Sequence, residues 1–589
     1  MKKIQFMDTS FRDGFQSCYG ARVATRDFLP AVEAAIHAGT THFEAGGGAR
    51  FQSLFFYCNE SAFDMMDSFR AVTGNDANLQ TLARGINVVA LSQQPRDIID
   101  LHAKLFKKHG ITTIRNFCAL NDVRNLKYSS QRIVANGLKH QIVVTMMDLP
   151  PGCTGAHTAE FYLQCIRNII DEQVPFESLC FKDASGTSNP RKIYDTVKGA
   201  RKLLGDDVTL WFHTHDTAGI GITQYIAAIQ GGIDGIDLCM APVSGGTCQP
   251  DILSMWHALK GTEYTIDIDY EKILKAEEVF TECMKDYFVP PEAKMVSPNI
   301  PLSPMPGGAL TANTMMMRDT KTLHLYPKVI REMSEVVKRG GFGTSVTPVS
   351  QFYFQQAYTN VTQGPWKKIQ PNYGDMVLGY YGRTPVEPDP DIVKLASAQM
   401  GKPVFTDDPL DILEPGIPKA TKVLEEHGLT ASEENIFIFA SCETKGLDYL
   451  LGRARTSIRK VSEEKSSALE TAPVKPKSLN GKRHYTVNVD GRAYQVIVSQ
   501  GGDISAQPSG IPEKPASSDS VEVNAPTPGN ILQILATVGD VVKKNETLLV
   551  LEAMKMETAI TAPSDGHISS IEVSQGDTVQ AGDLLVLLN

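Results

Sequence analysis

The chain has no long apolar run, no closely spaced cysteine pair and no surplus of basic residues. Its 589 residues include 57 Lys and Arg against 67 Asp and Glu, for a net charge of −10. A nucleic-acid-binding protein needs a basic surface for phosphates, and nothing in this charge balance sets one aside. We therefore expect no nucleic-acid partner.

Apolar segments are also too short for a membrane span. None approaches the roughly 18 uninterrupted apolar residues that a spanning helix requires. The first segment reaches Asp8 before an apolar run of signal-peptide length can form. The 10 cysteines are scattered without a CxxC pair, and several lie in or beside apolar runs, as reduced thiols do. We expect a soluble protein of the cytoplasm.

Short apolar segments rich in β-branched residues alternate with amphipathic helical segments from residue 1 to about 260. The expected strands are Ile4–Asp8, His42–Ala45, Leu79–Ala83, Thr113–Phe117, Ile142–Met146, Ser178–Phe181, Thr209–Phe212 and Gly235–Met240. Strands alternating with helices over about 250 residues predict an α/β protein with a (β/α)8 TIM barrel, assigned to residues 1–265. A doubly wound open sheet is the alternative.

The rest of the chain divides into three parts. Residues 266–465 carry mainly helical patterns with Gly- and Pro-rich interruptions, and are expected to form a helical C-terminal extension of the barrel. Residues 466–520 contain a short strand pair around an Asp490–Gly491 turn, followed by a Ser-, Pro- and Gly-rich linker. Residues 521–589 form the last domain.

This last domain contains an internal repeat. Ala525-Pro526 recurs as Ala562-Pro563, and Gly539-Asp540 recurs as Gly576-Asp577 at the same offset. Two equivalent halves predict a small all-β domain with approximate two-fold symmetry. The unmatched segment EAMKMETAIT joins the halves, so it must form an exposed hairpin.

Lys555 lies at the tip of this hairpin. The run Ala553-Met554-Lys555-Met556 resembles, without departure, the motif of biotinyl domains in biotin-dependent carboxylases. The resemblance implies a biotinyl (hammerhead) domain with biotin covalently attached to Lys555 by a biotin protein ligase. Lipoyl domains share the fold but usually place other residues around their lysine.

Polar side chains follow the carboxyl ends of the expected barrel strands, where barrels of this type carry their active sites. These are Arg12, Asp13, Gln16, Arg84, Lys182, Asp183, His213 and His215. Because residues i and i+2 of a strand point to one side, His213 and His215 can bind one ion together. With Asp13 they form a ligand set for a divalent metal such as Zn²⁺, Mn²⁺ or Co²⁺. Asp216 and Asp237 are candidates to orient the imidazoles or, equally, to cap turns.

Lys182 leaves several alternatives open. It could form a Schiff base, pair with Asp183, or direct its amine to solvent. An ammonium beside a dication is repelled, so the amine should lose its proton or be modified. Carbamylation would turn it into a carboxylate-type ligand.

Residues from about 5 to 470 resemble the carboxyltransferase component of pyruvate carboxylase and the α subunit of oxaloacetate decarboxylase. The motifs that carry the resemblance are DTSFRDGFQS, RNFCALNDVRNL, FKDASGTSNP, HTHDTAG, APVSGGTCQPD and MPGGALTAN. Three departures lie near the expected mouth: RDGFQS in place of the commoner RDAHQS, Cys118 in place of Asp, and GGGARFQ over residues 46–52.

The resemblance implies specific roles for the polar residues of the mouth. Asp13, His213, His215 and a carboxylated Lys182 are the implied metal ligands. Arg12, Gln16 and Arg84 are the implied substrate-binding residues. Thr311 is the implied proton-transferring residue, acting with Lys182 and Arg12 as the catalytic set.

The implied function is biotin-dependent carboxyl transfer between carboxybiotin and pyruvate/oxaloacetate. The sequence offers no ATP-grasp-sized region and no P-loop to charge the biotin, so a partner is expected. With a separate biotin carboxylase subunit, the chain would be the B-type subunit of a two-subunit pyruvate carboxylase, a ligase, which we favour. With a membrane decarboxylase subunit, it would be the α subunit of the sodium-pumping oxaloacetate decarboxylase, a lyase associated with the membrane through its partner.

Two other functions fit part of the pattern. RDG-x-Q with a later H-x-H is also typical of metal-dependent aldol-type lyases and synthases, but these need no tethered biotin. A non-catalytic biotin carrier or scaffold is disfavoured by the complete ligand set. A homo-oligomer is the expected assembly, as for most soluble enzymes of this size.

Overall fold

The computed structural model describes residues 1–461, 482–489, 492–499, 521–553 and 556–589. Within these ranges, no helix is long and apolar enough to cross a membrane.

Eight parallel strands close into a barrel in chain order. They are β2 (Gln5–Asp8), β3 (His42–Glu44), β4 (Asn78–Ala83), β5 (Thr113–Asn116), β6 (Lys139–Thr145), β7 (Ser178–Asp183), β8 (Thr209–Thr214) and β9 (Gly235–Leu238). The barrel closes where β2 pairs with β9, with Gln5 opposite Gly235. The (β/α)8 prediction is confirmed and the open-sheet alternative is wrong. The largest difference in a strand start is at β6, which begins at Lys139 rather than Ile142.

Amphipathic helices surround the barrel. They include α2 (Thr25–His37), α4 (Ala62–Thr73), α5 (Arg96–Lys108), α6 (Arg124–Ala135), α7 (Ala159–Asp171), α8 (Pro190–Leu204), α9 (Gly221–Gly231) and α10 (Ile252–Ala258). In α5, Ile98 and Leu105 are buried while Lys104 and Lys108 are exposed, so one apolar stripe faces the strands. Helix α8 begins sharply because Asn189 accepts a hydrogen bond from the backbone N–H of Lys192.

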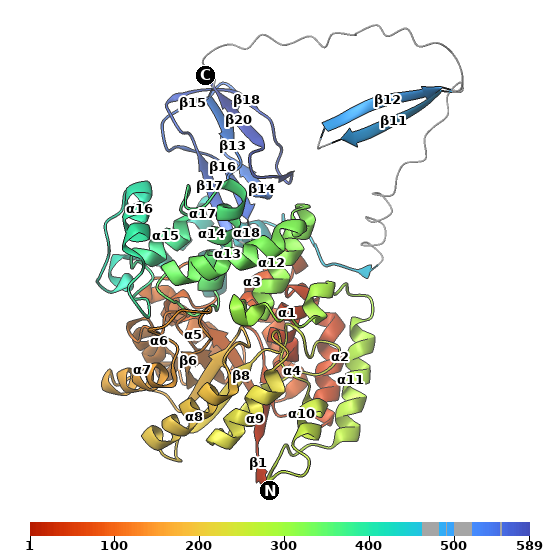
Figure 1. Cartoon of the computed structure of the whole chain (residues 1–589), viewed down its shortest axis with the longest axis vertical. Coiled ribbons are helices and arrows are strands. Elements are labelled where there is room, and N and C mark those ends of the chain that lie inside the picture. The colour runs from red at the N-terminus through yellow and green to blue at the C-terminus, as the bar shows by residue number, and fades with distance from the viewer. Residues whose placement is uncertain (462–481, 490–491, 500–520, 554–555) are drawn as a thin grey trace.

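A helical extension follows the barrel, as predicted. Helix α11 (Tyr270–Met284) packs against α2. The remaining long helices lie across the end of the barrel nearest the C-terminal domain (Figure 1). They are α12 (Gly307–Asp319), α13 (Tyr326–Arg339), α14 (Val349–Gln363), α15 (Pro371–Val377), α16 (Pro390–Met400), α17 (Gly416–Glu426) and α18 (Glu433–Leu450).

The C-terminal domain, hereafter the carrier domain, consists of two four-stranded sheets in the orders β13-β20-β18-β15 and β17-β16-β14-β19. The strands are β13 (Val521–Asn524), β14 (Gly529–Ile534), β15 (Val541–Val542), β16 (Thr547–Ala553), β17 (Met556–Thr561), β18 (Gly566–Ile571), β19 (Thr578–Val579) and β20 (Leu584–Leu588). Leu548 and Leu585, which are equivalent in the repeat, are both fully buried between the sheets. The strand orders show that each sheet contains strands from both halves of the repeat, as two equivalent halves predict.

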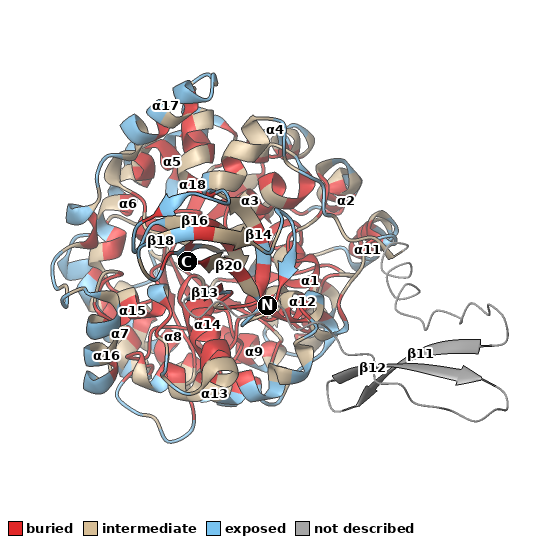
Figure 2. Cartoon of the chain, turned by 90° about the horizontal axis from the view of Figure 1, so that it is seen from above, coloured by how far each residue is buried: buried red, intermediate tan, exposed pale blue. Residues whose placement is uncertain are grey.

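The expected strand pair is present as β11 (Lys482–Val489) and β12 (Arg492–Ser499), which run antiparallel. Its Asp490–Gly491 turn, the linker segment 500–520 and Lys555 lie outside the described residues. The carrier domain rests on the helical extension in Figure 1 and lies over the middle of the molecule in Figure 2.

Candidate active site

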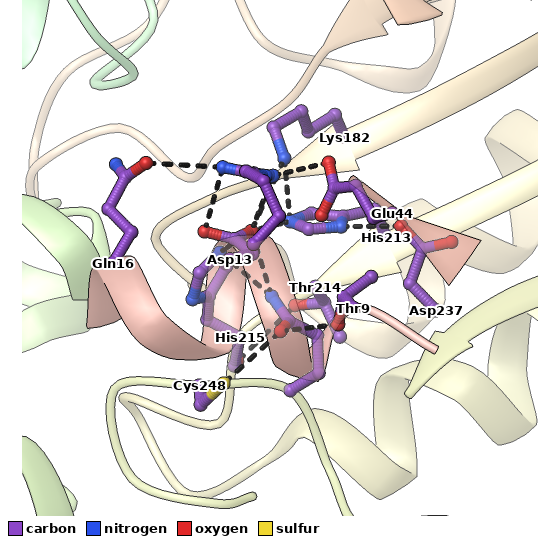
Figure 3. Close-up of polar contacts among 12 residues, drawn as sticks. Thr9, Asp13, Gln16, Glu44, Lys182, His213, Thr214, His215, Asp237 and Cys248 are labelled. Atoms are coloured by element: carbon purple, nitrogen blue, oxygen red, sulfur yellow. Dashed lines mark hydrogen bonds and ion pairs between the residues drawn. The ribbon is translucent and has the colours of Figure 1, made fainter. Parts of the chain in front are cut away.

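Three buried side chains converge at the carboxyl ends of β2 and β8 (Figure 3). Asp13 lies in η1 (Ser10–Gly14), a π-helical turn of the kind often found at functional sites, while His213 and His215 come from the end of β8. Asp13 Oδ2 lies 3.4 Å from His213 Nε2 and 3.3 Å from His215 Nε2. The three candidate ligand atoms lie within 4.8 Å of one another. This spacing and donor set fit one divalent ion.

Hydrogen bonds at the far nitrogens orient both imidazoles. His213 Nδ1 lies 2.6 Å from Asp237 Oδ2, and His215 Nδ1 lies 2.7 Å from the carbonyl oxygen of Thr247. Both acceptors fix the proton on Nδ1 and leave the lone pair on Nε2, the nitrogen that would bind a metal. Burial, and then the proximity of Lys182, hold the pKa of His213 well below its usual value, so the ring is neutral, as a ligand must be.

Of the two candidate orienting residues, the structure places only Asp237 against an imidazole. Asp237 is itself held by Arg115, whose Nη2 donates to Asp237 Oδ1 over 3.1 Å. Asp216 instead accepts from the backbone N–H of Gly221 at 2.9 Å, where it caps the start of α9.

Lys182, the residue before the last of β7, lies beside the same cluster. Its Nζ lies 2.7 Å from His213 Nε2 and 3.9 Å from Asp13 Oδ2. Asp183 turns away and accepts hydrogen bonds from Ser185 and the backbone of Ser188. Burial lowers the pKa of Lys182 despite the opposing effect of Asp13. A readily neutralised amine at this place fits carbamylation, since only the free amine reacts with CO₂.

Arg12 links the metal cluster to two further groups. Its Nη1 donates to Asp13 Oδ1 over 3.3 Å and to Gln16 Oε1 over 3.2 Å. Its Nη2 donates to the buried carboxylate of Glu44 at the end of β3. Glu44 was not singled out from the sequence, although its place at a strand end was a usable signal.

Arg84 follows β4 and is buried without an acidic partner. Its Nη1 donates to the carbonyl oxygens of Val89, over 2.6 Å, and Ala90, over 3.0 Å. Its Nε has no hydrogen-bond partner, and no described carboxylate forms an ion pair with it. Burial, followed by repulsion from Arg12, lowers the pKa of Arg84 to about 9, so the side chain is still cationic at neutral pH.

One small cavity of about 30 Å³ brings most of these groups together. The predicted residues among those that line it are Arg12, Asp13, Gln16, Arg84, Lys182 and His215. His213 lies directly behind Lys182, in hydrogen-bond contact with it.

Thr311 lies beside this cavity rather than on its wall. It is buried in α12, where its Oγ1 donates to the carbonyl oxygen of Ser17 and lies 3.5 Å from Thr247 Oγ1. Gly308, one turn earlier in α12, does line the cavity. The structure thus connects Thr311 to the cluster through Thr247, whose carbonyl holds His215.

Gln249 contacts Asp13 and His215 and was not singled out from the sequence. Its Nε2 donates to Asp13 Oδ2 over 3.1 Å and lies 3.2 Å from His215 Nε2. Its Oε1 accepts from Thr9 Oγ1 over 2.9 Å and from Cys239 Sγ over 3.1 Å. The only available signal was its position inside the APVSGGTCQPD motif, in the loop after the last barrel strand.

Three family models match successive parts of the chain. They are an HMGL-like model over residues 132–280, a conserved carboxylase domain over residues 300–498, and a biotin-requiring enzyme domain over residues 521–588. The HMGL-like match covers part of the barrel and its immediate continuation, and it includes the H-x-H pair of the aldol-type pattern but not the RDG-x-Q segment. The third match gives a biotin domain that this alternative does not explain.

The sequence similarity to known relatives extends over most of the chain. The B-type pyruvate carboxylase subunit of Methanocaldococcus jannaschii is 29% identical over 94% of this chain and 94% of its own length. The 2-oxoglutarate carboxylase large subunit of Hydrogenobacter thermophilus is 27% identical over 95% of this chain and 91% of its own. A complete multifunctional pyruvate carboxylase from Rhizobium etli has the same fold, with a TM-score of 0.69 at 22% identity over 99% of this chain. This chain spans about half of that protein, 56% of its length.

A TIM barrel, a conserved carboxylase extension and a biotin domain in one chain define a biotin-dependent carboxyltransferase. The chain is an enzyme of this class. Within the class, it is similar over most of its length to B-type subunits of pyruvate carboxylase.

Proposed function

We propose that this chain transfers a carboxyl group between carboxybiotin and pyruvate/oxaloacetate as the B-type subunit of a two-subunit pyruvate carboxylase. The observation that carries the proposal is the cavity in which Arg84, a buried cation without an acidic partner among the described residues, faces the Asp13 and His215 cluster. A small anion with a carbonyl next to its carboxylate matches both features.

The residues in and beside the cavity have separate roles in this proposal. Arg84 binds the substrate carboxylate, and Arg12 and Gln16 orient the carbonyl group. A Zn²⁺, Mn²⁺ or Co²⁺ ion held by Asp13, His213, His215 and carboxylated Lys182 would stabilise negative charge on the carbonyl oxygen. Thr311 Oγ1 carries the proton between the methyl carbon of pyruvate and the biotin nitrogen, which gains the proton when it gives up the carboxyl group and loses it in the reverse direction.

Lys555 is the proposed biotin attachment site. Ala553 at the end of β16 pairs with Met556 at the start of β17, so the two strands bracket residues 554–555. This is the hairpin expected of an acceptor turn for a biotin protein ligase. Intact mass of protein purified from its native cells should show one biotin, which Lys555→Arg abolishes.

The proposed substrate class and partner are inferred from the names of the relatives. One relative is named for pyruvate carboxylase and another for 2-oxoglutarate carboxylase, so a 2-oxo acid is the shared class. Both are carboxylases, which favours a biotin carboxylase subunit as partner over the membrane decarboxylase subunit of the alternative. A homo-oligomer in the cytoplasm completes the proposal.

The test combines a native avidin pull-down with a transfer assay. We expect a biotin carboxylase subunit to co-purify, and the biotinylated chain to convert oxaloacetate to pyruvate when a biotin acceptor is present. Arg84→Gln should raise the KM for the 2-oxo acid by about 10–100-fold, since it removes a charge-assisted contact. Arg191→Gln, at an exposed ion pair on α8, is the matched control. Preference for 2-oxoglutarate, or recovery of a membrane decarboxylase subunit, would overturn the assignment.

A further inference from the structure

Two glutamates of the carrier domain contact the main body of the molecule. Lys445 Nζ, from α18, lies 2.5 Å from Glu552 Oε2, and Tyr57 OH donates to Glu552 Oε1 over 3.3 Å. Thr444 Oγ1, the neighbour of Lys445, donates to Glu557 Oε2 over 2.9 Å. Glu552 and Glu557 pair directly across β16 and β17, so they flank the predicted acceptor turn on both strands.

These contacts are more enclosed than an ordinary surface ion pair. The side chains of Lys445 and Glu552 are only 13% and 14% exposed. Exposed pairs contribute little because water and salt screen them, whereas a partly desolvated pair discriminates strongly against the loss of either partner. A further hydrogen bond, from Gln363 of α14 to the carbonyl oxygen of Pro526, also joins the body to the carrier domain.

Helix α18 is broken next to these contacts. Glu443 has φ 48° and ψ −132°, a left-handed conformation inside the helix that is costly for any residue with a Cβ. The break immediately precedes Thr444 and Lys445, the two residues of α18 that hold the carrier glutamates. Strained backbone that persists in a folded protein concentrates at functional positions, and here it lies beside a contact between domains.

The contact region adjoins the active site. A cavity of about 420 Å³ lies between the carrier domain and the body, with Lys445, Glu552, Glu557 and Ala90 among its lining residues. The carbonyl oxygen of Ala90 accepts a hydrogen bond from Arg84. When the carrier domain occupies this position, only the loop that contains Ala90 separates the cavity from Arg84, the proposed substrate-binding residue.

We propose that Tyr57, Thr444 and Lys445 form a docking site for this chain's own carrier domain, which they recognise through Glu552 and Glu557. The site selects the carrier by the two carboxylates on the strands that flank residues 554–555, and it holds these carboxylates beside the loop that supports Arg84. Its functional value rests on the proposed biotinylation of Lys555, but the docking contact itself can be tested without any activity.

The first test is zero-length cross-linking of the full chain with a carbodiimide, read by peptide mass spectrometry. We expect an amide between Lys445 and Glu552, and its loss in Lys445→Gln but not in Lys422→Gln, an exposed lysine on the neighbouring α17. The surface pair of Lys104 and Glu433 reports that the reagent has worked. Absence of the Lys445–Glu552 product while that surface pair reacts would overturn the docking site.

The second test compares turnover with tethered and with free biotin. Lys445→Glu should lower the ratio of tethered to free turnover at least tenfold, and combining it with Glu552→Lys should restore the ratio. Intact mass must show equal biotin content in each variant, because Glu552 lies near the modified lysine. An unchanged ratio contradicts the proposal. If the wild-type chain transfers nothing even with free biotin, the proposed function fails, while the cross-link still decides the docking site.

Discussion

The two arginines of the cavity differ in how their charges are balanced. The positive charge of Arg12 is balanced by ion pairs with Asp13 and Glu44, so its guanidinium is already held by protein carboxylates. Burial acts to raise the pKa of Asp13, but Arg12, His215 and Lys182 outweigh it and hold that pKa well below its usual value. Arg84 has no such partner within the part of the chain that the structure describes, so a substrate anion would balance its charge.

Thr311 provides a residue-scale test of the chemistry. Thr311→Ala should keep metal and biotin in place yet reduce transfer by about 10²–10⁴-fold, the range for loss of a proton-transferring group. Thr311→Ser should retain much of the activity because it keeps the hydroxyl. Thr314→Ala, which removes another buried hydroxyl from α12, is the control. Full activity in Thr311→Ala would remove Thr311 from the reaction.

Gln249 provides a second test, directed at the metal site. Gln249→Met removes the amide that donates to the Asp13 carboxylate while nearly preserving volume, so we expect metal affinity to fall by about 10–100-fold. Competition titration against a chelator measures this change. Gln356→Met, at a buried amide in α14 remote from the cavity, should leave affinity unchanged. Equal affinity in wild type and Gln249→Met would show that the contact does not support the ligands.

At the scale of elements, the sequence predicts strand order and therefore the residues that meet at strand ends. Asp13, Lys182, His213 and His215 could be placed together because parallel barrel strands end on one face. Gln249 and Thr247 could not, since their contacts depend on how the loop after β9 folds back over the cluster. The choice between Asp237 and Asp216 likewise depended on side-chain direction, which residue spacing does not specify.

The break in α18 was equally invisible in the sequence. The segment SCETKG has no proline, and its glycine, Gly446, lies three residues after the residue that takes the unusual backbone angles. The segment lies in the region expected to be mainly helical, and nothing in it marks a break at position 443. Local propensity does not account for the conformation of Glu443, which lines the cavity between α18 and the carrier domain.

This break predicts that the usual order of stability of alanine and glycine in a helix is reversed at position 443. In a regular helix, Ala is more stable than Gly by about 1 kcal/mol. At position 443 we expect the reverse, with Glu443→Gly more stable than Glu443→Ala by about 1 kcal/mol, because only glycine adopts φ 48° without strain. Thermal unfolding of the two variants in parallel measures the difference. A more stable alanine variant would show that α18 is continuous in solution.

At the scale of the whole molecule, the carrier domain must bind its docking site reversibly, so the contact must be weak enough for the domain to dissociate in each cycle. A tether of tens of residues keeps a linked domain at an effective concentration in the millimolar range, so a few polar contacts suffice for partial occupancy. A dock built from two carboxylates, one lysine and two hydroxyls suits this need better than a large apolar interface, which would hold the domain too long.

Glu557 makes the same dock sensitive to pH. Burial raises its pKa to about 7; Glu443 and Glu552 add to the increase, while the hydrogen bond from Thr444 and the charge of Lys445 oppose it. Released into water, the carboxyl returns towards its ordinary value of 4.5. The docked state therefore binds the proton more tightly, and docking should strengthen as pH falls from about 8 to about 5.

Small-angle X-ray scattering of the full chain can follow this change. We expect the radius of gyration to increase between pH 5 and pH 8 as the ionised Glu557 weakens the dock. Glu557→Gln mimics the protonated form, so its radius should change less over the same range, whereas Glu572→Gln, on the carrier domain away from the dock, should behave like wild type. Identical curves for wild type and Glu557→Gln would mean that this carboxyl stays ionised in the dock. Lys445 would then have to stabilise both glutamates of the carrier.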